Sequence, residues 1–300
     1  MATIIRDLAT LQGTPELVPE NMTPLLVLLG QNGFVGESVF NLVSSPDAVL
    51  WEKETFNDKF SLATKIQERG GPQNTEFDVE QKSAEAYDYN LYSAITAKQA
   101  RGKNTFAFID IMVKKMDAMA GRLRMNVEKD ILTALRDTIT YTEIKQYSAS
   151  SAWTAFTTSN PMRDVLKTAD LIAATGYEAD AIIIGRGDET NLTLSDRVVD
   201  ATKYNRDYNE DGIEFKTLFG YDLFVSNARY KSGTSYARIL STKAIMLSQG
   251  LSGELKEAQP YLADSDYDKK HKEMVLLASR TIKPVVTYEE TVGIIHNISS

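Results

Sequence analysis

The residues best placed for chemistry follow a short apolar run in the second half of the chain. Residues 181–184 (AIII) have the character of a buried strand, and Gly185, Arg186 and Gly187 follow them directly. A strand, a glycine turn and a helix often hold a phosphate, because backbone N–H groups and the helix N-terminus point at the anion. A nucleotide-binding enzyme is therefore the first function to test.

The glycine pattern after this strand is incomplete. A dinucleotide-binding turn has the form G-x-G-x-x-G, and Thr190 stands where the third glycine belongs. No clear strand ending in an acidic residue follows about 20 residues later, as ribose binding requires. The Gly-Lys-Ser or Gly-Lys-Thr of a Walker loop is also absent. We therefore expect no cofactor and interpret the glycines as a turn.

One acidic segment has the first half of a calcium-binding loop. Asp207, Asn209 and Asp211 alternate before Gly212, but the twelfth position, where a bidentate glutamate belongs, is Leu218. The acidic run 264–268 (DSDYD) alternates similarly without a glycine. Both segments are expected to be exposed acidic turns. No metal is expected, and the two aspartates and the asparagine are only the residues that would bind one.

Other catalytic arrangements are missing from the sequence. The chain has no cysteine and two histidines, His271 and His296, neither of which belongs to a recognisable motif. Both histidines are expected to be solvated or structural. The patterns G-x-S-x-G and H-E-x-x-H do not occur. We expect no catalytic residues, which shifts weight from an enzyme to a structural protein.

The amino-acid composition restricts the classes of partner that this chain is expected to bind. The 300 residues are 43% hydrophobic and 25% charged, which is typical of a globular protein. The net charge of −8 argues against tight, non-specific binding to nucleic acid, because such binding neutralises phosphates with Lys and Arg. The apolar run 25–29 is far shorter than the ~20 residues that span a bilayer, and residues 1–13 lack a signal-peptide pattern. We expect no membrane association.

The first half of the chain predicts three elements. Residues 1–47 contain scattered prolines and favour an extended arm with one short helix, which must lie on its own chain or on a neighbouring copy. Alternation over 56–67 and again over 87–95, around the turn signal Gly70-Gly71-Pro72, predicts one long hairpin. Residues 105–138 show helical periodicity.

The predicted long helix has two faces. Apolar residues recur along one face, and four basic residues recur every seven positions opposite it. These are Lys115, Arg122, Lys129 and Arg136. Two interpretations stay open, a solvated face and a surface that meets phosphates.

The second half alternates helix and strand signals. A helix is predicted from Pro161 to Gly176 with Asn160 as N-cap, and another over 192–199. Strands are predicted over 181–184, 221–226 and 236–248, and further apolar strand-like runs close the chain. This alternation indicates an α/β or α+β domain over 160–260.

In this order, the elements resemble the major capsid protein of tailed phages with the Hong Kong 97-type fold. The resemblance covers nearly the whole chain and lies in the order of its segments, not in any single one. These segments are GFVGESVF (33–40), VLWEKETFNDKF (49–60), RGGPQ (69–73), YDYNLYSAI (87–95), the helix 108–135, residues 160–185, TLFGYDLFVS (217–226), YARILSTKAIMLS (236–248) and LLASRTIKPVVTY (276–288).

The resemblance implies an α+β fold of four parts. These are an N-terminal arm (1–47), an extended β-hairpin loop (48–102), a peripheral domain with a long spine helix (103–159 and 261–300) and an axial domain (160–260). The implied function is structural: copies form hexamers and pentamers of an icosahedral head shell around packaged double-stranded DNA. The arm starts almost at once, so a scaffold is expected to be separate, absent or already removed.

The resemblance also implies partners and site residues. Implied partners are further copies, a portal protein, scaffolding or decoration proteins and DNA, in a virion assembled in the host cytoplasm. Contacts with neighbouring subunits are expected at the hairpin tip and after the axial strand, namely at Arg69, Gly70, Gly71, Arg186, Asp188 and Glu189. The basic stripe Lys115, Arg122, Lys129 and Arg136 is expected to face inward toward DNA.

Two alternatives remain. An encapsulin-type shell protein has the same fold, and IIRDLA (4–9) is similar to the start of such proteins. That alternative predicts a small uniform particle that carries protein. A nucleotide-dependent enzyme predicts a monomer or small oligomer with measurable ligand affinity.

Overall fold

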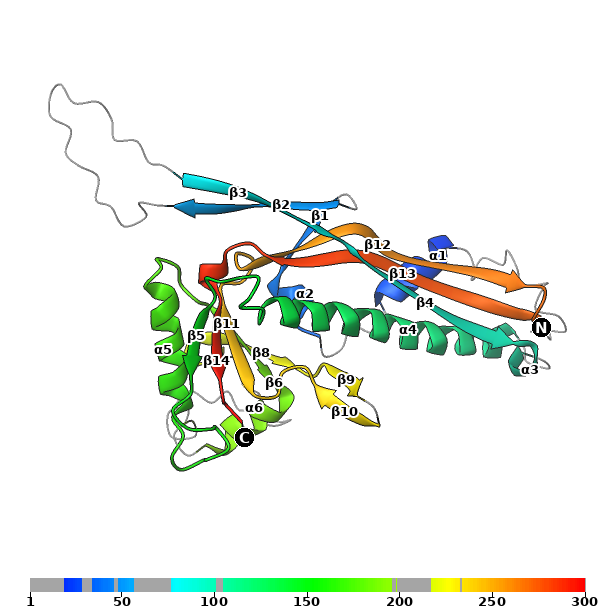
Figure 1. Cartoon of the computed structure of the whole chain (residues 1–300). Helices are drawn as coiled ribbons and strands as arrows, with labels where there is room; N and C mark the ends of the chain where they lie inside the picture. The colour runs from blue at the N-terminus through cyan, green and yellow to red at the C-terminus, as the bar shows by residue number, and fades with distance from the viewer. Residues whose placement is uncertain are drawn as a thin grey trace, which may run out of the picture.

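A long helix, α4 (Thr105–Ala134), runs along one face of an elongated sheet and ends against a second sheet (Figure 1). The computed structural model describes residues 19–28, 34–45, 48–56, 77–100, 105–195, 198, 217–232 and 234–299. The helix predicted over 105–138 is confirmed as far as Ala134. Its buried residues recur every three or four positions, as the sequence predicted: Met112, Met116, Met119, Leu123, Val127 and Ile131.

Four strands form the elongated sheet in the order β1-β12-β13-β4. They are β1 (Asn41–Ser44), β12 (Gly253–Asp268), β13 (Glu273–Val286) and β4 (Tyr87–Thr96). One face packs on α4, where Met274, Leu276 and Ala278 are buried at alternate positions. Each large apolar side chain buried in this way contributes roughly 1.5–3 kcal/mol. The short helix α3 (Ala97–Ala100) connects β4 to α4.

The arm lies on its own chain where it is described. Helix α1 (Pro19–Leu28) packs on β12 and α4 through the fully buried Met22 and Leu26. Helix α2 (Gly36–Val39) then meets the C-terminal half of α4 and leads into β1. The own-chain alternative is therefore correct for these segments.

The second sheet has six strands in the order β5-β14-β11-β6-β8-β7. Their bounds are β5 (Lys145–Ser148), β6 (Ala181–Gly185), β7 (Thr217–Leu218), β8 (Tyr221–Ser226), β11 (Lys243–Leu247) and β14 (Gly293–His296). A turn of 3-10 helix, Glu289–Thr291, precedes β14. Helix α5 (Pro161–Ala173) covers one face with Val165 and Ile172, and Asn160 caps it as predicted. Helix α6 (Arg186–Leu194) follows β6.

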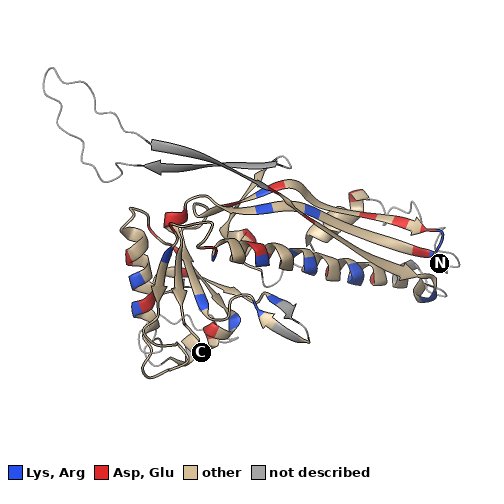
Figure 2. Ribbon diagram, viewed as in Figure 1, with Lys and Arg blue, Asp and Glu red and all other residues tan. Residues whose placement is uncertain are grey.

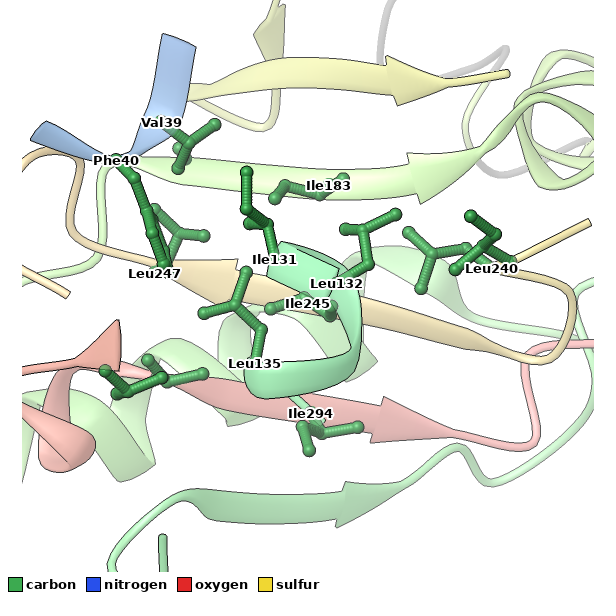
Figure 3. Close-up of a cluster of buried hydrophobic side chains, with 14 of the residues drawn as sticks. Val39, Phe40, Ile131, Leu132, Leu135, Ile183, Leu240, Ile245, Leu247 and Ile294 are labelled. Carbon is green, nitrogen blue, oxygen red and sulfur yellow. The ribbon is translucent and has the colours of Figure 1, made fainter. Parts of the chain in front are cut away.

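The opposite face of this sheet receives the end of α4. Ile131, Leu132 and Leu135 point toward Ile183 of β6 and Ile245 of β11, all fully buried (Figure 3). The core therefore joins the two sheets through one helix, and the α+β fold class expected from the sequence is confirmed. Charged residues occupy the sides of α4 that the sheets leave open (Figure 2).

The hairpin of the structure pairs different strands from those that the sequence predicted. Strand β2 (Ala48–Phe56) pairs with β3 (Phe77–Glu85), and within the described part of the chain this ribbon pairs with no other strand. The run 87–95, expected to be its second strand, is β4 and pairs with β13. The pairing predicted for 87–95 was wrong, because alternation alone does not identify the strand opposite. The other predicted strand, 56–67, lies outside the described residues after Phe56.

Four further boundaries differ from the sequence-based expectation. The run 236–248 is two strands, β10 (Ser235–Arg238) and β11, and β10 pairs with β9 (Arg229–Ser232). The boundary expected at 260 falls inside β12, and β5 and β14 join the second sheet. The acidic run 264–268 ends strand β12 instead of forming a turn. Helix α6 overlaps the helix expected over 192–199 only as far as Leu194, and residues 196, 197 and 199 lie outside the described residues. None of the described helices is long and apolar enough to cross a membrane.

Candidate assembly surfaces

The glycines after β6 do not form a phosphate cradle. Gly185 is the extended N-cap of α6, and Gly187 lies inside its first turn, so the expected glycine turn is a helix start. Neither has a positive φ. A Cβ at Gly185 would collide with the Leu240 carbonyl oxygen, and one at Gly187 would collide with the Arg238 guanidinium. Close packing against backbone therefore explains Gly185, whereas the flexible Arg238 side chain could move aside for a Cβ at Gly187.

The acidic residues of this turn oppose anion binding. Asp188 and Glu189 occupy the first turn of α6, where they interact favourably with the helix dipole themselves. Asp188 is only 3% exposed, and its burial raises the pKa to about 6 despite the charge of Arg238. Asp188 is therefore buried within its own chain, and the subunit interface expected at this residue stays a prediction. Arg186 is 59% exposed and pairs with Glu189 at 2.9 Å.

The basic stripe on α4 divides into two kinds of residue. Lys115 Nζ donates to the Ala94 carbonyl oxygen of β4 at 2.8 Å, and Arg136 Nη1 donates to the Ile239 carbonyl oxygen at 2.9 Å. These two cations hold the chain to itself. Arg122 and Lys129 are exposed. The four residues are thus not equally exposed, and the inward-facing basic stripe stays a prediction.

Several expected site residues lie outside the described residues. This applies to the hairpin tip, Arg69, Gly70 and Gly71, and to the calcium candidates Asp207, Asn209 and Asp211. Among the described residues, Asp268, His271 and Glu273 gather at the β12–β13 turn. Lys269, Lys270 and Lys272 share that turn and disfavour a cation there. Asp268 instead accepts from His271 Nδ1 at 2.6 Å and raises the pKa of this histidine.

A buried carboxylate joins the arm, α4 and the second sheet. Glu128 is 1% exposed, and its Oε2 accepts the N–H groups of Gly36 at 2.5 Å and Val35 at 3.2 Å. Its Oε1 accepts the Ser226 hydroxyl of β8 at 2.7 Å. Burial raises the pKa of Glu128 in spite of these donors. We name Glu128 with these three partners the Glu128 junction.

A second charged group fastens the same arm to the first sheet. Arg280 of β13 is 3% exposed, and its Nη1 donates to Glu37 Oε1 of α2 while its Nε donates to Glu257 Oε1 at 2.8 Å. Its guanidinium also lies over the Tyr261 ring, 4.3 Å from the centroid. Arg124 of α4 reaches the other oxygen of Glu37 at 3.4 Å. We name Arg280 with Glu37, Glu257 and Tyr261 the Arg280 junction.

Neither junction was predicted from the sequence. For Glu128 one signal existed, because Val127, Ile131 and Leu132 make that part of α4 apolar on more than one side, which indicates burial all round. For Arg280 we find no local signal, since its partners come from α2 and β12.

Two surfaces expose apolar side chains. On the free face of the first sheet, Tyr92 is 77% exposed beside its cross-strand partner Leu277, and Leu277 stands opposite Asp264. On α5, Met162 and Leu166 are exposed one turn apart. Exposed apolar groups that gather on one face are typical of protein contact surfaces.

Comparisons with solved structures concern the whole chain. A phage-related protein from Bordetella bronchiseptica superposes with a TM-score of 0.69 at 13% identity, over 94% of this chain and 98% of that one. A virus-like particle from Pyrococcus furiosus gives 0.60 at 11%, over 93% and 99%. The capsid of the cyanophage P-SCSP1u gives 0.60 at 10%, over 89% of each. No family model matches the sequence, and the search of curated proteins gives no match. At these identities the likeness shows a shared fold.

Proposed function

We propose that this chain, which has the Hong Kong 97-type fold of phage capsid proteins, assembles into the icosahedral head shell of a tailed double-stranded DNA phage. The observation that carries the proposal is the extent of the likeness to a phage capsid: the superposition with the capsid of the cyanophage P-SCSP1u spans 89% of each chain. Fold alone does not imply function, so the surfaces must support it.

The surfaces support assembly with further copies. A two-stranded ribbon is marginal in water, and β2–β3 pairs with no other described strand of its own chain. The exposed apolar residues of the first sheet and of α5 also lie on outer faces of the subunit. Contacts in hexamers and pentamers would cover these elements, and each interface would add stability to the subunit.

The molecule enclosed by the shell, DNA or protein, distinguishes two possible functions. The likeness to the virus-like particle from Pyrococcus furiosus favours, as a second candidate, an encapsulin-type shell that encloses protein. A phage head additionally needs a portal and, in some cases, scaffolding or decoration proteins. The shell wall needs no sequence readout of DNA, and the net charge of −8 would limit adhesion to host nucleic acid during assembly.

Electron microscopy of the purified chain tests assembly. We expect closed particles or hexameric and pentameric rings, and a protein that stays monomeric at high concentration would contradict the proposal. The cargo test uses particles from infected or induced cells treated with nuclease. Protected double-stranded DNA supports a phage head, whereas particles that hold a protein and no DNA support the second candidate.

A further inference from the structure

The free face of the first sheet carries a row of three side chains whose chemistry together fits a lysine. Asp264 of β12 stands directly opposite Leu277 of β13, and Leu277 stands directly opposite Tyr92 of β4. Direct cross-strand partners project from the same face of a sheet, and the neighbours Leu276 and Ala278 are buried on the α4 face. The three side chains therefore lie on the face that α4 leaves open. We name them the Asp264 row.

Each member of the Asp264 row is exposed and offers a different contact. Tyr92 is 77% exposed, Leu277 is 42% exposed, and Asp264 is exposed as well. A carboxylate pairs with an ammonium group, an aromatic ring attracts a cation over its face, and an aliphatic side chain packs along the methylene stem of a lysine. Asp264 Oδ1 also accepts the Ser265 N–H at 2.7 Å, and a carboxylate keeps further acceptor capacity. Asp266, two residues along β12, extends the acidic edge of this face.

The same chain exposes lysines at the end of this sheet. Residues 269–272 (KKHK), in the turn between β12 and β13, are all basic and all exposed. Figure 2 shows this basic turn at the end of the elongated sheet. Asp268 at the start of the turn accepts the N–H groups of Lys270 and His271 and the ring of His271. Its charge is therefore used within the turn, and the turn presents cations outward.

The lysines of the turn do not reach the Asp264 row of their own chain. Four residues separate the row from the strand ends at Asp268 and Glu273, and a strand rises about 3.3 Å per residue. The turn is thus roughly 13 Å from the row, which is longer than a lysine side chain. A second copy has no such restriction, because its turn can approach the open face from outside.

We propose that the turn 269–272 of one copy docks on the Asp264 row of a neighbouring copy, with its lysines on Asp264 and Asp266 and against the Tyr92 ring. This inference rests on the proposed function and names one of the contacts that hold the shell together. The opposite charges of the two surfaces fix which parts of the copies meet. The contact joins two different surfaces of the same subunit, and such a heterologous contact closes into a ring where the rotation between copies allows it.

Charge reversal tests whether these two surfaces meet each other. The face variant is Asp264→Lys with Asp266→Lys, the turn variant is Lys269→Glu with Lys270→Glu, and the combined variant carries all four changes. Light scattering and electron microscopy give the lowest concentration at which the purified full chain forms particles. The face variant and the turn variant each oppose like charges and should raise this concentration about tenfold or more. The combined variant restores opposite charges, keeps the net charge of wild type, and should assemble close to the wild-type concentration.

A matched control changes the same charge at another place. Asp110→Lys with Asp117→Lys, on the exposed side of α4, adds the same charge as the face variant and should leave the assembly concentration unchanged. The thermal midpoint of each unassembled variant shows whether it is folded. Recovery of particles by the combined variant would itself show that all four positions tolerate the change.

Three outcomes overturn the inference. Loss of assembly in the face variant alone would mean that another occupant, such as a neighbouring hairpin or a separate basic protein, covers the row. Loss in both variants without recovery in the combined variant would mean that the two surfaces do not meet. Normal assembly of both variants would mean that neither surface is a contact. A wild type that forms no particles defeats the proposed function as well, whereas normal wild-type particles with any of these three results defeat only this inference.

Discussion

The Glu128 junction and the Arg280 junction fasten the same arm segment by different means. Glu128 is a buried anion that receives two backbone N–H groups and one hydroxyl, with no cation among its partners. Arg280 is a buried cation that meets two carboxylates and an aromatic ring. Dipoles therefore hold α2 on one side and opposite charges hold it on the other. The two arrangements should respond differently to truncation, to added volume and to pH.

The largest effect is expected at the Arg280 junction. Arg280→Met leaves the Glu37 and Glu257 carboxylates near each other without their shared cation, and removing one partner of a buried ion pair costs about 3 kcal/mol or more. Urea unfolding of the purified chain measures the loss. Lys167→Met is the control, because its ion pair with Asp170 is exposed and is worth about 0.5 kcal/mol. Equal losses in the two variants would contradict the assigned role of Arg280.

Glu128→Ala should cost less, about 2 kcal/mol. The change leaves the Gly36 N–H and the Ser226 hydroxyl without an acceptor in a buried place, but it also removes the cost of burying a charge. Asp117→Ala on the exposed side of α4 is the control and should change the free energy of unfolding by less than about 0.5 kcal/mol. Hydrogen exchange at residues 34–40 should accelerate in Glu128→Ala alone.

Added volume at the same place tests how tightly the arm is seated. A Cβ at Gly36 would stand 2.7 Å from Glu128 Oε2 and 2.7 Å from Ile131 Cδ1, so Gly36→Ala should cost about 1–2 kcal/mol. Gly121→Ala is the matched control, since a Cβ there meets nothing within 4 Å and the helix gains about 0.5–1 kcal/mol. Opposite signs in thermal unfolding are expected, and a stabilising Gly36→Ala would show that the contact is loose.

The smallest expected effect is a difference between the two junctions in how the free energy of unfolding depends on pH. Burial raises the pKa of Glu128 above its ordinary value of 4.5, so the folded chain binds this proton more tightly than the unfolded chain. The stability that wild type has relative to Glu128→Gln is therefore fully present below pH 4.5 and is lost as the pH rises through the folded pKa. At neutral pH the two should differ by about 1 kcal/mol or less.

Denaturant unfolding across this pH range measures that difference. The nearby Glu37 carboxylate adds to the rise in the pKa of Glu128, and a relative stability that increases with pH would contradict the assignment. Arg280→Met provides the comparison, because a guanidinium stays charged throughout and its own titration contributes no pH dependence.

Local patterns in the sequence predicted the elements whose apolar residues are most clearly arranged. The long helix, α5 with its Asn160 cap, and the buried strand β6 all follow from spacing and capping chemistry, which act within a few residues. The order of these elements was enough to suggest the fold. The same reasoning assigned the Gly185–Gly187 segment to a turn, whereas Gly185 is the N-cap of α6 and Asp188 and Glu189 occupy its first turn.

The sequence by itself determined that this chain lacks the motifs of common enzymes and carries a net negative charge. It also determined the alternating apolar runs and one long amphipathic helix. Tertiary structure decided the partners. It placed β4 beside β13, seated Glu128 under the arm, and set Arg229 opposite Arg238. Spacing fixes which face a side chain occupies, but strand pairing and buried hydrogen bonds join residues far apart in the chain. A local sequence pattern therefore does not identify partners that lie far apart in the chain.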